Sequence, residues 1–418
     1  MAIASHRCNV VIVGAGPAGL AAALELKRLG VADLRVIDRE PEAGGVPRLC
    51  HHSGFGIRDF HRIYSGPAYA HRYAGMAEAA GIAVYTATTA TGWAGPRTLS
   101  LTSPRGLEQI EAAAILLATG CRERPRSARL VPGSRPSGIF TTGSLQQFVH
   151  GHGQPVGHRA VIVGAELVSL SALMTLAGAG STIAMMTTEL PRHQIYFPYL
   201  PFKWYAADLL TRTPIVNRTR VSRILGRQRV EAVEMTHLDS GRSEVVACDT
   251  VVFTGDWVPE HELARRGGLL LDPATRGPLV DTKLRSSARG VFAAGNLLRG
   301  AETADVAALE GRRAARHIHN FLERGIWAES ILPIQGESPI SWVTPGAIPA
   351  SCDRPPLGYF LFRVSEFCRD TQMRVCQGER VLYQQRFRRL QPNQSIRLSS
   401  GWLAAVNPAG EALRLVVR

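Results

Sequence analysis

The 418-residue sequence contains only three lysines, Lys27, Lys203 and Lys283, although arginine brings its formal net charge to +14. Schiff-base catalysis therefore has few candidate residues, and we discount it. The arginines are spread along the chain and are not clustered with aromatic residues, which argues against a nucleic-acid interface. Anionic cofactors or an acidic protein partner account for the basic charge at least as well.

Closely spaced cysteines are also missing. The seven cysteines are scattered, and no CxxC motif occurs. Dithiol–disulfide catalysis needs one thiol to attack and a nearby thiol to resolve, so we do not expect that chemistry. An odd number of scattered cysteines also argues against a disulfide framework.

Long hydrophobic runs are absent as well. No apolar run approaches the length needed to cross a bilayer, and the first predicted strand begins within ten residues of Met1, which leaves no room for a signal peptide. We therefore expect a cytoplasmic protein that does not bind a membrane. A hydrophobic content of 45% and a charged content of 20% are ordinary for a globular chain, and the length allows two or three domains.

The clearest pattern that is present lies in residues 10–45 and predicts a dinucleotide site. An apolar run at residues 10–13 breaks at the motif Gly14-Ala-Gly-Pro-Ala-Gly19, and a helix follows. The first glycine permits a tight turn, Gly16 lets a diphosphate approach the backbone, and Gly19 lets the helix pack on the strand. The next strand ends at Asp38, a carboxylate placed to hydrogen-bond a ribose.

A similar pattern recurs near residue 160. A strand at residues 160–163 is followed by Gly164-Ala-Glu-Leu-Val-Ser169 and a further helix. Glu166 and Ser169 stand at the second and third glycine positions, and a glutamate there would repel a diphosphate and block the backbone. The repeat is therefore either a working second nucleotide site or a structural repeat that has lost or altered its ligand.

Two later strand ends carry related signals. Residues 114–118 form a buried strand that ends in Thr119-Gly120, and residues 291–294 form another that ends in Gly295-Asn296. The helix that begins near Thr303 and Ala304 would point its N-terminus into the cleft. The chain therefore returns to its first sheet after the second nucleotide unit.

The region from residue 330 has a different character. Six prolines between residues 333 and 356 indicate a linker, and short alternating runs then indicate a small antiparallel domain. We expect an α/β fold with two Rossmann-like dinucleotide-binding domains, the second inserted in the first, and a C-terminal antiparallel β domain. The first domain would comprise residues 1–125 and 280–330, the second, NAD(P)-type, residues 126–279, and the C-terminal domain residues 331–418.

Taken together, these motifs resemble the two-dinucleotide-domain flavoproteins, the pyridine nucleotide-disulfide oxidoreductase superfamily that includes thioredoxin reductase and glutathione reductase. The resemblance covers residues 8 to about 325 and implies that the first unit holds FAD, with NAD(P)H as a second candidate cofactor. Asn296 stands where the superfamily usually has aspartate. The expected cofactor-binding residues are Gly14, Gly16, Pro17, Ala18, Gly19, Asp38, Arg39, Gly45, Arg48, Thr119, Gly120, Gly164, Gly295, Asn296, Thr303 and Ala304.

The stretch from Glu42 to Gly56, EAGGVPRLCHHSGFG, together with Gly66-Pro-Ala-Tyr69, looks like a narrower group. It is similar to the alpha-type subunits of hydrogen cyanide synthase, opine oxidases and hydroxyproline or proline dehydrogenases. Such subunits commonly pair with a second flavoprotein that oxidises a C–N bond, and many carry a cysteine-rich iron–sulfur module. The cysteines of this C-terminal region have neither the number nor the spacing for such a cluster.

Cys50, His51 and His52 follow the glycine pair, where the resemblance places groups that face the flavin ring. A histidine there could exchange protons with reduced flavin or substrate. The alternative is that the loop only lines and positions the cofactor. Three neighbouring ligands in one loop cannot surround zinc without others, so we expect no metal site. Arg48 is expected first as a phosphate contact.

These observations favour an FAD-dependent oxidoreductase without a redox-active disulfide. We expect it to act on a small-molecule substrate as a subunit or electron-transfer partner in the oxidation of an amine, an amino acid or a related metabolite. The alternatives are a stand-alone NAD(P)H-dependent reductase and a non-catalytic nucleotide-binding assembly subunit. Reduction of the flavin by a nicotinamide nucleotide would distinguish the first alternative.

Overall fold

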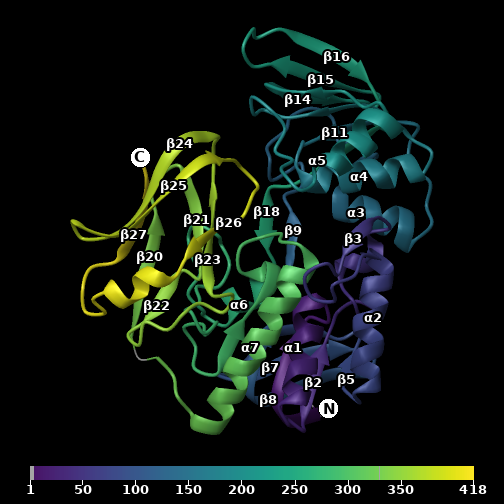
Figure 1. The fold of residues 1–418 in the computed structure, drawn as a ribbon. Helices are drawn as coiled ribbons and strands as arrows, with labels where there is room; N and C mark the ends of the chain where they lie inside the picture. Colours follow the sequence, from purple (N-terminus) through teal and green to yellow (C-terminus); the bar gives the residue numbers. More distant parts are fainter. Residues whose placement is uncertain (1–3, 329) are drawn as a thin grey trace. The chain divides into compact units, whose positions relative to one another are not determined.

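The computed structural model describes residues 4–328 and 330–418 and contains two compact units (Figure 1). Unit 1 comprises Met1–Arg48, Ser53–Cys121 and Pro259–Arg418, and unit 2 comprises Leu49–His52 and Arg122–Val258. Residues 259–279 therefore do not belong to the second nucleotide unit, as the sequence had suggested. They pack in unit 1, where the indole Nε1 of Trp93 donates to the carbonyl oxygen of Leu263 at 2.8 Å.

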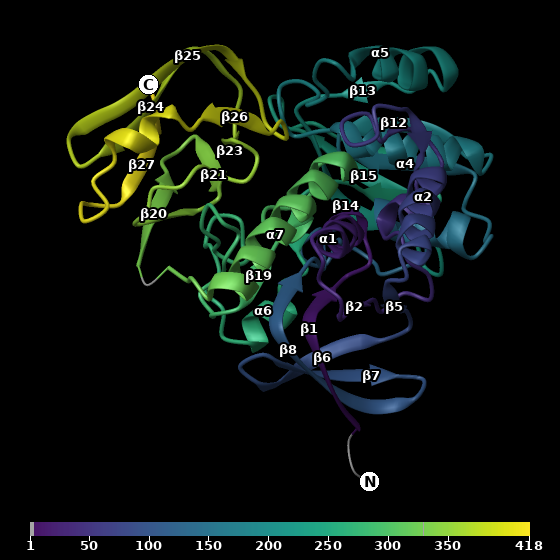
Figure 2. The same ribbon diagram turned by 60° about the horizontal axis from the view of Figure 1, so that its bottom comes forward.

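The main sheet of unit 1 has the strand order β5-β2-β1-β8-β7-β6, and β19 pairs with β8. Strands β5, β2, β1, β8 and β19 are parallel, whereas β6, β7 and the first half of β8 form an antiparallel meander (Figure 2). The strands are β1 (Ala4–Val13), β2 (Leu34–Ile37), β5 (Ala83–Tyr85), β6 (Thr89–Gly95), β7 (Thr98–Ser103), β8 (Gly106–Leu117) and β19 (Val291–Ala293), and a separate hairpin comprises β3 (Ser53–Phe55) and β4 (Tyr64–Ser65).

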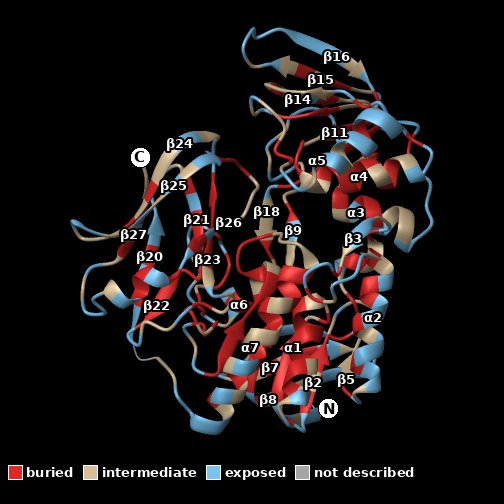
Figure 3. Ribbon diagram, viewed as in Figure 1, coloured by how far each residue is buried: buried red, intermediate tan, exposed pale blue. Residues whose placement is uncertain are grey.

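Helices α1 and α7 pack closely against each other in the buried part of unit 1 (Figure 3). Helix α7 can approach α1 because a Cβ atom at Gly311 would lie 2.0 Å from the carbonyl oxygen of Ala18. Gly325, in a left-handed conformation, ends α7. The helices are α1 (Pro17–Arg28), η1 (Val46–Leu49), α2 (Gly66–Ala79), α6 (Glu262–Arg266), η4 (Gly295–Leu297) and α7 (Ala304–Arg324).

Unit 2 repeats the strand–turn–helix arrangement in a five-stranded parallel sheet with the order β10-β17-β11-β12-β13. Its strands are β10 (Ile139–Thr141), β11 (Arg159–Val163), β12 (Thr182–Thr187), β13 (Ile215–Val216) and β17 (Thr250–Phe253), with an antiparallel sheet of β14 (Thr219–Leu225), β15 (Ala232–His237) and β16 (Ser243–Ala247). The helices are α3 (Thr142–Gln146), η2 (Gln147–Gly151), α4 (Leu167–Gly178), α5 (Leu200–Lys203) and η3 (Trp204–Leu210). The chain passes between the units in β9 (Cys121–Glu123) and β18 (Trp257–Pro259).

The C-terminal part of unit 1 has its own apolar core and two sheets, with the orders β22-β20-β27-β24-β25 and β21-β23-β26. All pairings are antiparallel except that of β20 with β27. The elements are β20 (Ile331–Gly336), β21 (Ile340–Thr344), β22 (Ala347–Pro349), β23 (Tyr359–Val364), β24 (Cys368–Gln377), β25 (Arg380–Leu390), β26 (Ile396–Ser399), η5 (Gly401–Ala405) and β27 (Leu413–Val417).

The proline-rich region from residue 333 is not the linker that its composition indicates. It contains β20, β21 and β22, and Pro349 lies in β22, the edge strand of its sheet. An edge strand tolerates proline because the missing N–H group can face away from the ladder. The composition alone therefore gave the wrong local structure here.

Candidate functional site

The glycine turn between β1 and α1 leaves space at one position only. A Cβ atom at Gly14 would lie 2.3 Å from the carbonyl oxygen of Ala118, and one at Gly19 would lie 1.8 Å from the carbonyl oxygen of Gly14. A Cβ atom at Gly16 would meet nothing closer than the Cα atom of Gly45, at 3.9 Å. Packing therefore requires glycine at positions 14 and 19, whereas the space above Gly16 is open to a ligand such as the diphosphate of FAD.

Helix α1 begins directly beneath this space. Gly16 is its N-cap, Pro17 follows at the first helical position, and the first turn contains no acidic residue. The positive end of the helix dipole is thus not neutralised by a carboxylate of its own first turn. This arrangement suits a bound diphosphate.

Asp38, at the end of β2, holds the turn from the neighbouring strand. Its Oδ2 accepts the N–H of Ala15 at 2.5 Å, and its Oδ1 accepts the N–H of Glu40 at 2.8 Å. Burial raises the pKa of this carboxyl above its ordinary value, against the opposing effect of these two hydrogen bonds. The N–H of Gly44 donates to the carbonyl oxygen of Ala15 at 2.8 Å, which brings the Gly44-Gly45 loop to the same place.

The two predicted arginines of this loop region already have acidic neighbours. Arg48 lies 3.4 Å from Glu40 and 3.1 Å from Glu42, and Arg39 lies 3.6 Å from Glu260. The Nε atom of Arg48 is buried and has no hydrogen-bond partner among the described residues. A phosphate would therefore share Arg48 with two carboxylates.

The remaining predicted residues of unit 1 lie at the ends of β8 and β19. The hydroxyl group of Thr119 donates to the carbonyl oxygen of Glu260 at 2.8 Å, and Gly120 accepts the N–H of Glu260. Gly295 donates its N–H to Glu310 at 2.8 Å, and a Cβ atom at Gly295 would lie 2.8 Å from the Cβ of Ala18. The structure thus brings the Gly295 loop against the start of α1.

Sequence reasoning missed a polar cluster at the start of α7. Thr303 is the N-cap, and its hydroxyl group donates to Asp305 at 2.5 Å. The guanidinium of Arg58 donates to Thr303 at 3.0 Å and to Asp305 at 3.1 Å, and the N–H of Arg58 also donates to Asp305. Asp305 had been expected only to cap the helix, and no local sequence signal connects it to a residue 247 positions away.

In unit 2, the turn that corresponds to the first glycine motif is filled by the chain itself. Glu166 is the N-cap of α4, is 6% exposed and accepts the N–H of Ala165 at 3.0 Å. Its other oxygen accepts the hydroxyl group of Thr254 at 2.5 Å. A Cβ atom at Gly164 would lie 1.8 Å from the Thr254 hydroxyl and 2.9 Å from the Glu166 carboxylate.

The Glu166 carboxylate therefore occupies the position that a diphosphate takes at such a turn. Burial raises the pKa of this carboxyl above its ordinary value. The residues present do not fit a nicotinamide nucleotide in this conformation, although the surrounding fold is of the NAD(P)-binding type. Gly164 is held by packing and offers no open space.

The predicted catalytic residues belong to unit 2 and are not described together with the flavin residues of unit 1. Cys50 is buried, its Sγ donates to Gln146 Oε1 at 3.5 Å, and burial raises its pKa to about 12. The ring of His51 stacks on His150 with centroids 3.9 Å apart, and His52 lies 6.3 Å from the ring of Phe202. The high pKa argues against a thiolate at position 50, and the catalytic roles stay predictions.

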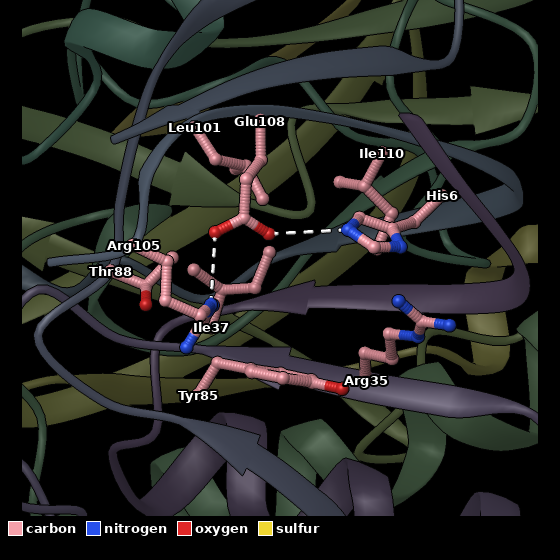
Figure 4. A pocket seen from close by; sticks show the side chains of 9 residues that line it. All are labelled: His6, Arg35, Ile37, Tyr85, Thr88, Leu101, Arg105, Glu108 and Ile110. Atoms are coloured by element: carbon pink, nitrogen blue, oxygen red, sulfur yellow. Dashed lines mark hydrogen bonds and ion pairs between the residues drawn. The ribbon is translucent and has the colours of Figure 1, made fainter. Parts of the chain in front are cut away.

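A small pocket in unit 1 lies apart from these residues. It measures about 90 Å³, and its charged groups largely satisfy each other, since Glu108 lies 3.1 Å from Arg105 and 3.3 Å from His6 (Figure 4). Ligand pockets measure roughly 300–1,000 Å³. We therefore assign no cofactor to it. It is lined by His6, Arg35, Ile37, Tyr85, Thr88, Leu101, Arg105, Glu108 and Ile110.

Two further features are missing from the part of the chain that the structure describes. No group of three or more histidine, cysteine, aspartate or glutamate side chains is arranged to hold a metal ion within residues 4–328 and 330–418. Over the same residues, no helix is long and apolar enough to cross a membrane.

Comparison with solved structures supports the architecture. Thioredoxin reductase from T. acidophilum superposes with a TM-score of 0.62 at 19% identity, covering 75% of this chain and 98% of that one. L-proline dehydrogenase from P. horikoshii superposes with a TM-score of 0.57 at 19% identity, covering 79% and 58% of the two chains. These matches confirm the predicted α/β fold.

Comparison with sequences identifies the family. A subunit of opine oxidase from Agrobacterium tumefaciens (strain Ach5) is 27% identical over 73% of this chain and 64% of its own length. Hydrogen cyanide synthase subunit HcnB of Pseudomonas aeruginosa is 33% identical over 42% of this chain and 37% of its own. The chain thus spans less than two thirds of these relatives. The family model described as "Pyridine nucleotide-disulphide oxidoreductase" matches residues 8–311. The chain belongs to this family and is an FAD-dependent oxidoreductase.

Proposed function

We propose that this protein is the FAD-carrying subunit of an oxidoreductase that takes electrons from an amine, an amino acid or a related metabolite, together with a second flavoprotein subunit. The observation that carries the proposal is the position of Glu166. Its carboxylate fills the turn at which a nicotinamide nucleotide would place its diphosphate. An organic substrate or a protein partner is then the better source of electrons.

The cysteines support the same conclusion. No disulfide joins cysteines within the described residues, and burial raises the pKa of Cys50 to about 12 and that of Cys248 to about 11. A thiol of such high pKa is protonated near neutral pH and is a poor nucleophile. Electron transfer through a dithiol pair, as a reductase of disulfides would need, is therefore disfavoured.

The relatives supply the class of partner. Several are named as parts of larger oxidases or synthases, namely a subunit of opine oxidase, the alpha subunit of sarcosine oxidase and the HcnB subunit of hydrogen cyanide synthase. The same role for this chain follows by analogy and remains part of the proposal.

In this proposal, unit 1 binds and orients FAD, which supplies hydride acceptance. Gly16 and the start of α1 receive the diphosphate, and Asp38 receives a ribose from the end of β2. Arg39, Gly45, Arg48, Thr119 and Gly120 border the same space, and Gly295, Asn296, Thr303 and Ala304 contribute the loop before α7. His51 and His52 are proposed to exchange the proton that accompanies the hydride.

The experiment is an anaerobic titration of the FAD-loaded protein, first with NADH and then with NADPH, that follows the flavin absorbance band. We expect the band to persist with both nucleotides and to disappear on addition of dithionite, the control for a reducible flavin. The same titration is then made with amino acids and amines, alone and after co-expression with a flavoprotein encoded in an adjacent reading frame. Bleaching by a substrate only in the presence of that flavoprotein supports the subunit role.

Rapid bleaching by either nucleotide would overturn the proposal. It would favour the second candidate, a stand-alone NAD(P)H-dependent reductase, whose support is the retained NAD(P)-type fold of unit 2 and a 24% identical relative, ferredoxin–NADP reductase of Ignicoccus hospitalis. That function requires Glu166 to leave the turn. A flavin that resists dithionite as well would favour a non-catalytic assembly role.

A further inference from the structure

We propose that the C-terminal domain holds the FAD-binding loop in place through Arg363, a positioning residue on β23. The inference concerns residues 296–303, the loop between η4 and α7, whose ends were assigned above to the cofactor site. It rests on that assignment. The family model ends at residue 311, so nothing in the family match accounts for Arg363.

The loop is first closed on itself. The side chain of Asn296 bonds to the backbone of Glu302 twice, because its Oδ1 accepts the Glu302 N–H at 3.1 Å and its Nδ2 donates to the Glu302 carbonyl oxygen at 3.5 Å. Glu302 directly precedes Thr303, the N-cap of α7. The position of Glu302 therefore fixes both Asn296 and the start of the helix.

The side chain of Glu302 is held from the C-terminal domain. Arg363 donates to the Glu302 carboxylate at 3.0 Å and to the carbonyl oxygen of Ala301 at 2.6 Å. Ser395 donates to the same carboxylate, and Arg363 Nε donates to the Ser395 hydroxyl at 3.0 Å. Arg363 and Glu302 are only 10% and 11% exposed, so water screens this ion pair poorly.

Arg363 itself is rigidly supported. Its strand β23 pairs with β21 on one side and β26 on the other. Its guanidinium also lies 5.1 Å from the centroid of the Trp342 ring. A group fixed in this way positions the residues it contacts and lowers the entropic cost of ordering them around a ligand.

The test measures FAD affinity and loop mobility in the full-length protein. Arg363→Ala and Glu302→Gln are compared with the wild type by titration with FAD, and hydrogen exchange is followed at residues 296–306. We expect each variant to bind FAD at least about tenfold more weakly and to exchange faster in this loop. Arg363→Lys should rescue little, because one ammonium group cannot reproduce the planar set of donors to Glu302, Ala301 and Ser395.

Arg414→Ala is the matched control, since Arg414 forms an exposed ion pair with Glu337 in the same domain. It should leave FAD affinity unchanged. Should Arg363→Ala fail to fold, Glu302→Gln, which retains the backbone bonds with Asn296, decides the question. Wild-type affinity and loop exchange in Arg363→Ala or in Glu302→Gln would overturn the inference while leaving FAD binding intact. Failure of the wild type itself to bind FAD would instead overturn the assignment of the site.

Discussion

At the scale of single residues, Gly14 and Gly16 lie in one turn but serve different ends. Gly14 has φ +111° and no room for a Cβ atom, whereas Gly16 has an ordinary φ of −81° and open space. We expect Gly14→Ala to destabilise the fold by about 3 kcal/mol or more. Gly16→Ala should fold normally and bind FAD at least about tenfold more weakly. Thermal unfolding and FAD titration of both variants check this, and weak FAD binding should not accompany a loss of stability at position 16.

Glu166 gives unit 2 a pH dependence of known sign. Because burial raises its pKa in the folded state above the ordinary value of 4.5, its contribution to stability is fully present below pH 4.5 and is lost as pH rises through the raised pKa. Glu166→Gln cannot ionise. We therefore expect the variant to gain stability relative to the wild type as pH increases, measured by urea unfolding across about pH 4–8. A difference that stays constant over this range would contradict a buried, ionisable Glu166.

Glu166→Gly is the companion change for function. Removing the carboxylate vacates the space beside Gly164 and Ala165 and exposes the start of α4 to an anion. We expect the variant to acquire measurable binding of NADH or NADPH, detected as a shift in melting temperature that the Gln variant does not show. Equal behaviour of both variants would mean that other features close the turn.

The thiol of Cys50 should be inert in the folded protein. With a pKa of about 12 and a buried Sγ, it is protonated at neutral pH. We expect alkylation by iodoacetamide at about pH 8 to be at least roughly a hundredfold slower than in the urea-unfolded chain, as measured by mass spectrometry of the peptide that contains it. Rapid native modification would restore a nucleophilic role for this cysteine.

At the scale of elements, the start of α7 and η4 is supported by a buried ion pair. Arg299 and Glu310 lie 3.0 Å apart with side chains 0% and 4% exposed, and Glu310 also accepts the N–H of Gly295. We expect Arg299→Met to cost about 3–5 kcal/mol, because it leaves the Glu310 charge buried without its partner. The double variant Arg299→Met/Glu310→Leu should cost clearly less. Urea unfolding of the three proteins tests this, and simple additivity of the two substitutions would contradict it.

The sequence predicts those elements whose signals are local. The turn, helix α1 and the strand before it follow from a few adjacent residues, and β23 coincides with the expected strand at residues 359–364. The polar clusters could not be predicted, because Arg58 and Asp305 are 247 positions apart and Arg363 and Glu302 are 61 apart. Glu166 is intermediate: its conflict with a diphosphate is readable from its position, but its capping of α4 depends on Thr254 from another strand.

At the scale of the whole molecule, the two compact units differ in how their segments are distributed along the chain. The five-stranded sheet of unit 2 is complete within Arg122–Val258. Unit 1 needs β19 and α7, which follow that segment, to complete its sheet and to cover α1. The division of the chain into three domains, with residues 331–418 as a separate one, stays a prediction.

This interruption sets an order for synthesis on the ribosome. The side of α1 that meets Gly311 stays uncovered until some three hundred residues have been translated, whereas the sheet of unit 2 is finished earlier. A nascent chain in this state exposes apolar surface and is open to capture by chaperones or to aggregation. Slow translation before α7 would therefore lengthen the vulnerable period of unit 1, and FAD could be taken up only after the polypeptide had returned from its excursion.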